Sequence, residues 1–194
     1  MMKPLRVLLP QVICAALLTA ASLPGQLQSL QIDPADTKVD FVLPTVFHTV
    51  HGHFVLKRGT VQFNPGTGTA SGELVVDAAS GDSGSKARDH RMNKEILQSE
   101  KFPEIVFRPT SVEGKVLPSG ASQIQLHGIF SIHGQDHEIV MPLDIQASEG
   151  HYTAKGHFSV PYVKWGMKNP STLMLRVNDT VDIQIETIAR VPHS

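Results

Sequence analysis

Three histidines near the start of the chain have a spacing that suits a metal site. His48, His51 and His53 fall within six residues, and in an extended strand His51 and His53 point to the same side. Imidazole nitrogens bind Zn²⁺ and Cu²⁺, so a periplasmic metal-binding protein is one interpretation. No acidic residue occurs between Asp40 and Glu73 to supply a further ligand. We therefore expect these imidazoles to face solvent, and we predict no bound metal and no cofactor.

The side chains that could support hydrolysis are clustered but do not converge. Ser83, Ser85, Asp89 and His90 fall on one short segment, where side chains fan out around a helix. The chain also lacks the Gly-x-Ser-x-Gly turn of many hydrolases. We predict no catalytic residue and no enzymatic activity. An enzyme that acts on a lipid inside the protein stays an alternative, which a buried acid–base pair would reveal.

The segment from Ser83 to Phe107 differs in periodicity from the chain around it. Ser83 or Ser85 can begin a helix. Residues four apart then share a face, namely Arg88, Met92 and Ile96, and the ion pair Arg91 and Glu95. The pattern predicts one short helix near residues 84–98.

The rest of the chain alternates apolar and polar residues in short runs separated by Gly and Pro, which is typical of half-buried strands. No repeat or long linker divides it, so we predict one all-β, antiparallel domain over residues 33–191. Periodicity alone does not separate a sandwich from a barrel. The predicted strands are 33–43, 51–56, 60–63, 70–76, 104–110, 123–132, 137–145, 151–160 and 176–190.

Small residues recur on the apolar faces of four predicted strands. Gly52, Gly72, Gly128 and Gly156 share those faces with large apolar residues. Glycine there either permits the sharp bending of a closed sheet or leaves interior space for a ligand. An eight-stranded barrel is large enough to hold one small ligand in place of side chains.

Several motifs follow one another in an order that resembles YceI-like proteins, from about Thr37 to Ala189. They are Arg88-Asp89, Met92, Ser99 with Phe102–Phe107, the turn at Ile132–Asp136, and the corner at Tyr162–Met167. Arg91 departs from the histidine common in the family, and Ser99–Phe102 departs from its Asp-Phe-Phe-Asp-like stretch. The resemblance implies a single, roughly eight-stranded lipocalin-like barrel. It also implies a ligand such as a polyisoprenoid, an isoprenoid quinone or a fatty-acid derivative, bound for storage or transport in the cell envelope.

On this basis we expect a set of ligand-binding residues inside the barrel. They are Phe54, Leu56, Leu74, Phe107, Leu126, Gly128, Phe130, Ile139, Met141, Phe158 and Trp165. Arg88 and Asp89 are candidates at the rim, where they either hold the helix to the barrel or contact a headgroup.

The first 22 residues have the composition of a signal peptide. Lys3 and Arg6 precede an apolar run, and small residues near Ala21 and Ser22 suit cleavage. We therefore expect a periplasmic or secreted protein with no stable membrane insertion after cleavage. Cys14, the only cysteine, lies in this segment, so we expect no disulfide in the mature chain.

The charge of the remaining chain argues against nucleic acid. Without Lys3 and Arg6, 15 of the 17 Lys and Arg face 18 Asp and Glu, a formal charge of −3 with neutral histidines. A protein that binds a phosphate backbone needs a basic stripe. The expected partner is a hydrophobic lipid, and the sequence leaves a homodimer open.

Overall fold

The structure, a computed structural model, describes residues 27–173 and 175–192. The predicted signal peptide at residues 1–22 lies outside the described residues. The strands are β1 (Gln28–Ile32), β2 (Lys38–Pro44), β3 (Thr49–Phe54), β4 (Leu56–Phe63), β5 (Ala70–Asp77), β6 (Glu104–Gly114), β7 (Gly120–Ile132), β8 (Gln135–Ser148), β9 (His151–Val160) and β10 (Val181–Arg190).

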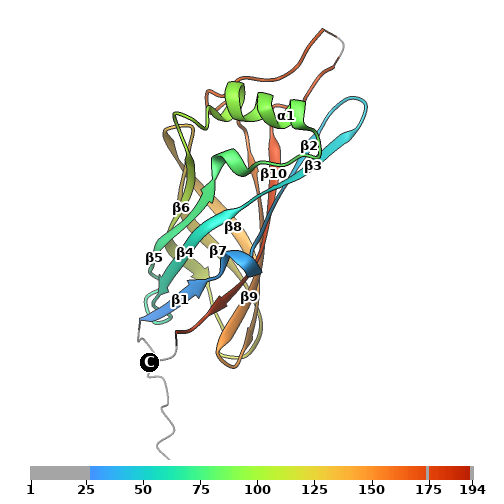
Figure 1. Ribbon diagram of the computed structural model, residues 1–194. Coiled ribbons are helices and arrows are strands. Elements are labelled where there is room, and N and C mark those ends of the chain that lie inside the picture. The colour runs from blue at the N-terminus through green and yellow to red at the C-terminus, as the bar shows by residue number, and fades with distance from the viewer. Residues whose placement is uncertain (1–26, 174, 193–194) are drawn as a thin grey trace, which may run out of the picture.

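These strands form one antiparallel sheet that closes on itself through the pairing of β1 with β10 (Figure 1). Because β10 pairs with both β1 and β2, those two strands together occupy one position in the barrel. Likewise β3 pairs with β2 and β4 pairs with β1, so β3 and β4 occupy the next position. The barrel is therefore eight-stranded, and the predicted all-β barrel is confirmed.

The two ends of the predicted strand set need correction. The strand predicted at 33–43 begins too late, because β1 lies before Asp33 and a short 3₁₀ turn, η1 (Pro34–Asp36), separates it from β2. The Asp33 carboxylate accepts a hydrogen bond from Ala35 N at 2.9 Å, and Pro34 fixes the turn. At the other end the strand predicted from 176 begins only at Val181.

The predicted helix lies across one end of the barrel (Figure 1) and consists of α1 (Lys86–Arg91) followed by the π-helical turn η3 (Met92–Leu97). The Arg91–Glu95 pair is confirmed, at 3.6 Å. Ser85 holds the N-cap position without a side-chain capping bond. Gln98, with φ 49°, ends the helix in the left-handed conformation. The short 3₁₀ turn η2 (Ala78–Ser80) leads from β5 toward it.

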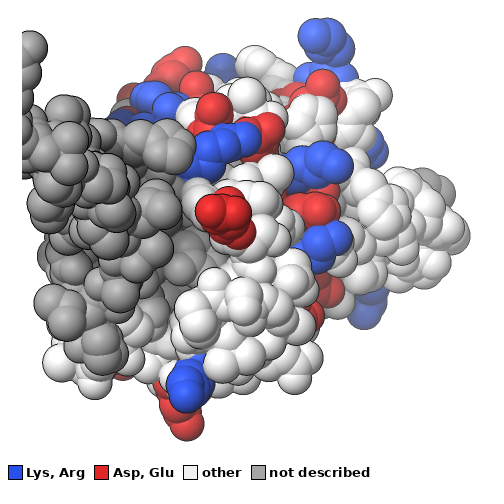
Figure 2. All heavy atoms as spheres, turned by 90° about the horizontal axis from the view of Figure 1, so that it is seen from below, with Lys and Arg blue, Asp and Glu red and all other residues white. Residues whose placement is uncertain are grey.

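The outer surface of the barrel is polar and mixed in charge. Figure 2, viewed from the end opposite α1, shows basic and acidic side chains interspersed. Ion pairs between neighbouring strands contribute to this pattern, among them Lys155 with Glu186 at 3.0 Å and Arg58 with Glu73 at 3.2 Å. Among the described residues, no helix is both long and apolar enough to cross a bilayer.

Candidate functional site

A cavity of about 260 Å³ runs through the interior of the barrel. Forty of the described residues line it, and they come from all ten strands, from η3 and from the segments that connect these elements. On β9 alone the wall extends from Tyr152 to Val160, which is roughly 26 Å of strand at about 3.3 Å per residue. So small a volume spread over so long a wall describes a slender tunnel. That shape suits one extended chain better than a compact ring system.

The wall of the cavity is almost entirely apolar. It contains no Asp, Glu, Lys, Arg or His side chain among the described residues. Where its polar side chains occur, they are hydrogen-bonded to protein atoms. The Tyr152 hydroxyl donates to Gln28 Oε1 at 3.1 Å, and the Tyr162 hydroxyl donates to the Asn178 carbonyl at 2.7 Å. Burial, with a smaller effect of Asp179, raises the pKa of Tyr162 to about 12, so this phenol stays neutral.

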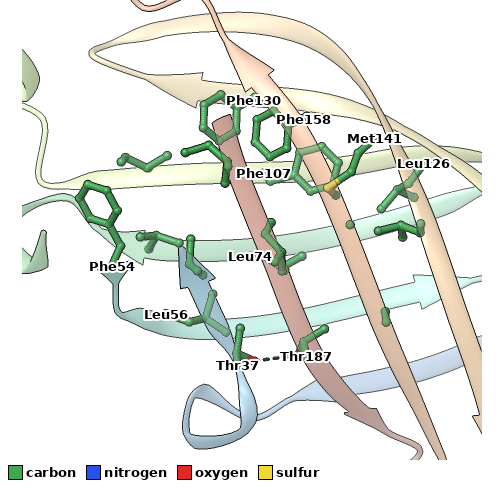
Figure 3. A pocket seen from close by; sticks show the side chains of 18 of the residues that line it. Thr37, Phe54, Leu56, Leu74, Phe107, Leu126, Phe130, Met141, Phe158 and Thr187 are labelled. Carbon is green, nitrogen blue, oxygen red and sulfur yellow. Dashed lines mark hydrogen bonds between the residues drawn. The ribbon is translucent and has the colours of Figure 1, made fainter. Parts of the chain in front are cut away.

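Thr37 and Thr187 provide the wall with its hydroxyl pair, and their protons can be assigned. Thr37 Oγ1 donates to the Asp33 carbonyl at 2.8 Å, which can only accept. In the 2.7 Å bond between the two hydroxyls, Thr187 must therefore be the donor (Figure 3). Both hydroxyl protons are thus used within the protein, and neither is free to donate to a ligand.

Eight of the eleven side chains predicted for the barrel interior line the cavity. Figure 3 shows them around one space: Phe54, Leu56, Leu74, Phe107, Leu126, Phe130, Met141 and Phe158. The other three, Gly128, Ile139 and Trp165, are not part of the wall. Gly128 and Ile139 face each other in the β7–β8 ladder. Ile139 is partly exposed and packs against the core beside the cavity.

The glycines on the inward faces leave less space than the sequence suggests, because neighbouring side chains fill it. A Cβ at Gly52 would meet the Phe41 ring, one at Gly128 the Phe107 ring, and one at Gly156 the Leu143 side chain. Of these three glycines only Gly156 lines the cavity. Gly72 has φ 113° and lies against the Thr60 carbonyl, so there the backbone conformation requires glycine.

Trp165 lies beside the cavity rather than in its wall. Its indole stacks on His137, with ring centroids 3.9 Å apart and planes within 5°. It also lies 6.0 Å from Phe130, which does line the wall. Burial lowers the pKa of His137, against a smaller opposing effect of Asp136. Trp165 thus contacts the cavity wall through Phe130.

Arg88 and Asp89 hold the start of the helix to the preceding loop and do not line the cavity. Asp89 Oδ1 accepts hydrogen bonds from Ser83 N at 2.9 Å and from Ser83 Oγ at 2.5 Å. Arg88 donates to Ser83 Oγ at 2.8 Å and to the Ser83 carbonyl at 2.7 Å. All these hydrogen bonds involve one buried serine, Ser83, and they tie the first turn of the helix to the loop before it. We call Ser83, Arg88 and Asp89 the Ser83 latch.

The helix contributes wall residues that the sequence analysis did not assign to the site. Met92, Ile96 and Leu97 line the cavity and close it at the helix end. Their shared helix face was visible in the sequence, but nothing local indicated that this face would cover a tunnel. Leu30 and Ile32 of β1 were also missed, although both alternate with polar residues.

The three histidines of the predicted cluster are not arranged as the three ligands of a metal ion. His48, His51 and His53 are all exposed on the turn before β3 and on β3 itself. Within residues 27–173 and 175–192, no three His, Cys, Asp or Glu side chains are placed to hold a metal ion. An exterior groove beside β3 is lined by His51, His53, Asp40 and Asp82.

Comparison with known proteins agrees with this architecture. The model of the YceI-like domain family matches residues 30–189. Among solved structures, BcnA of Burkholderia cenocepacia has a TM-score of 0.67 at 18% identity, covering 81% of this chain and 98% of that one. A polyisoprenoid binding domain from Saccharophagus degradans has a TM-score of 0.65 at 13% identity, covering 86% and 100%. The YCEI protein of Campylobacter jejuni has a TM-score of 0.56 at 16% identity, covering 70% and 81%. No curated protein sequence matches the chain.

Proposed function

Because the chain belongs to the YceI-like domain family, we propose that its barrel binds one hydrophobic, chain-like ligand such as a polyisoprenoid. The observation that carries this proposal is the slender cavity whose polar side chains are hydrogen-bonded within the protein. The polyisoprenoid binding described for the Saccharophagus degradans domain supports an isoprenoid as the ligand. An isoprenoid quinone or a fatty-acid derivative has the same kind of tail.

Burial of the chain is the main source of free energy for binding, because the wall offers few polar partners. Each buried CH₂ contributes about 0.8 kcal/mol, so roughly ten of them contribute about 8 kcal/mol before the costs of association. A Kd of about 1 μM needs a net gain of about 8 kcal/mol, so the buried chain must be long enough to offset the association costs of roughly 4–15 kcal/mol as well. Since the wall offers no charged partner for a headgroup, specificity would come from the length and width of the tail. The headgroup would remain at the mouth of the cavity.

A length series of prenols tests this function. Up to the length that fills the tunnel, each added CH₂ should tighten Kd roughly fourfold. Ala154 lines the cavity and its neighbour Thr153 does not, so Ala154→Phe should fill the tunnel and weaken binding, whereas Thr153→Phe should not. Native mass spectrometry of freshly purified protein should also detect a bound lipid. An affinity that is independent of chain length would contradict the proposal.

We propose that the protein stores or carries its ligand and does not transform it. The support is the composition of the wall, which holds no carboxylate, imidazole or amine among the described residues to move a proton at a buried ligand. A prenol incubated with the protein and then extracted should have an unchanged mass. A modified product in that extract would favour an enzyme instead.

We also propose that the protein is exported. Lys3 and Arg6 followed by an apolar run support this proposal. Amino-terminal sequencing of the protein from the cell envelope should give a start near Ala21 to Leu23. Recovery of the uncleaved chain from the cytoplasm would overturn it.

A further inference from the structure

Two turns project together at the helix end of the barrel. The first, residues 45–48, joins β2 to β3, and the second, of which residues 171–173 and 175–176 are described, precedes β10. The backbone N–H of Val46 donates to the Arg176 carbonyl at 3.2 Å, and that of Asn178 donates to the Pro44 carbonyl at 3.1 Å. Figure 1 shows both turns reaching beyond the barrel on the side where α1 lies. We call these two turns the tip.

The tip carries the most exposed large apolar side chains of the described residues. Leu173 is 102% exposed, Phe47 73% and Val46 67%, and no other large apolar side chain among those residues exceeds 55%. Apolar surface in water is unfavourable by about 25 cal/mol per Å². Single exposed apolar residues are ordinary, but a group of them on adjoining turns indicates a contact surface.

Charge is distributed unevenly between this end and the rest of the molecule. The segments that form the helix end, residues 78–103 and 161–180, contain eight Lys and Arg against five Asp and Glu, a formal charge of +3. The other described residues contain seven against thirteen, a formal charge of −6. Lys94, Lys164 and Arg176 are among the exposed cations of the positive end. The apolar tip therefore belongs to a net-positive end, whereas the rest of the described chain is net negative.

From these observations we propose that the tip docks the helix end of the barrel onto a bilayer surface rich in anionic lipid. A narrow, convex apolar tip can enter the headgroup region, while cations around it are attracted to anionic lipids. A second copy of this end would bring +3 against +3, which disfavours self-association there. A stable protein interface needs roughly 800 Å² on each partner, whereas the tip presents three strongly exposed large apolar side chains.

Docking would serve the proposed function, although it does not depend on the identity of the ligand. Met92, Ile96 and Leu97 cover the cavity at this same end. With the tip in the bilayer, an apolar chain leaving under the helix would enter lipid directly and would not cross water.

Flotation of the purified protein with vesicles tests the proposal. We expect binding to phosphatidylcholine vesicles that contain phosphatidylglycerol, weaker binding to phosphatidylcholine alone, and release as salt is raised. Phe47→Ser with Leu173→Ser should weaken binding at least about tenfold. The matched control, Leu117→Ser with Val140→Ser, removes exposed apolar side chains away from the tip and should bind as the wild type does.

Several outcomes would overturn the proposal. One is that the wild type binds neither kind of vesicle, and another is that it binds both equally at every salt concentration. A third is that the tip variant binds as strongly as the wild type does. If sedimentation instead shows a dimer that the tip variant abolishes, the tip is a self-association surface and the proposal is wrong. Prenol binding by the tip variant is measured in parallel. If the tip variant still binds prenol, loss of vesicle binding reports on docking alone and leaves the proposed function unaffected.

Discussion

The phenyl ring of Phe107 occupies the space in front of Gly128, where a Cβ would lie 2.5 Å from two of its carbons and 2.6 Å from the Arg108 carbonyl oxygen. The space beside Gly128 is therefore filled by the Phe107 ring of the neighbouring strand β6 and is not available to a ligand. Even the smallest side chain at position 128 has to displace Phe107 or the backbone.

Gly128→Ala should consequently destabilise the barrel by roughly 1–3 kcal/mol, as measured by urea unfolding. Phe107→Leu shortens the ring, so the double variant should lose less stability than the sum of the two single variants. The Arg108 carbonyl stays in place, which limits the rescue. Strict additivity would show that the ring and the glycine do not interact in solution.

The Thr37–Thr187 pair should respond asymmetrically to loss of its hydroxyls. Thr37→Val removes both bonds of Thr37 and leaves the buried Thr187 hydroxyl without a partner, which should cost about 1–3 kcal/mol in the free energy of unfolding. Adding Thr187→Val removes that stranded hydroxyl and should restore part of the stability. Prenol affinity should be unchanged, since neither hydroxyl has a proton to donate. Weakened prenol binding in the double variant would instead place a headgroup there.

The Ser83 latch should control access under the helix. Asp89→Ala removes the acceptor of two hydrogen bonds from Ser83, so amide exchange over residues 81–101 should become faster in the empty protein. Prenol uptake should accelerate, and the same segment should become protected when prenol is bound. Glu100→Ala, an exposed acid outside the latch, is the control. Strong, ligand-independent protection in both variants would show that the helix is fixed.

Acid should destabilise the protein through two partly buried histidines, His133 and His137. Burial lowers the pKa of His137 and of His133 below the ordinary 6.5, with Lys101 adding to the effect at His133. The unfolded chain therefore binds protons that the folded chain excludes, so stability is full above about pH 7 and falls as the pH drops below 6.5. His137→Phe keeps a flat ring against Trp165 and should lose less stability between pH 7 and 5. If the free energy of unfolding of the wild type and that of His137→Phe fell equally with pH, this account would be contradicted.

The strands were predictable because alternation is a local property of the sequence, whereas closure into a barrel was predicted from the resemblance to YceI-like proteins. The same local information placed the first strand incorrectly. Asp33 and Pro34 form a turn between β1 and β2, and only the pairing of both strands with β10 shows that they share one position in the barrel. It could not reveal that the Phe41 and Phe107 rings cover Gly52 and Gly128, because those contacts join neighbouring strands. Trp165 was expected at the ligand for its size, and its stacking partner His137 belongs to another segment.

β10 is the one strand that pairs with β1, β2 and β9, and this has a consequence for biogenesis. The barrel cannot close until β10 is available, because Ile32 of β1 must pair with Ala189 of β10. Such a contact has a high loop-closure entropy and forms late. During synthesis the earlier strands would present unpaired edges and open apolar faces, which are prone to aggregation. A nascent chain arrested before Val181 would therefore depend on chaperones, however complete its ligand-lining residues are.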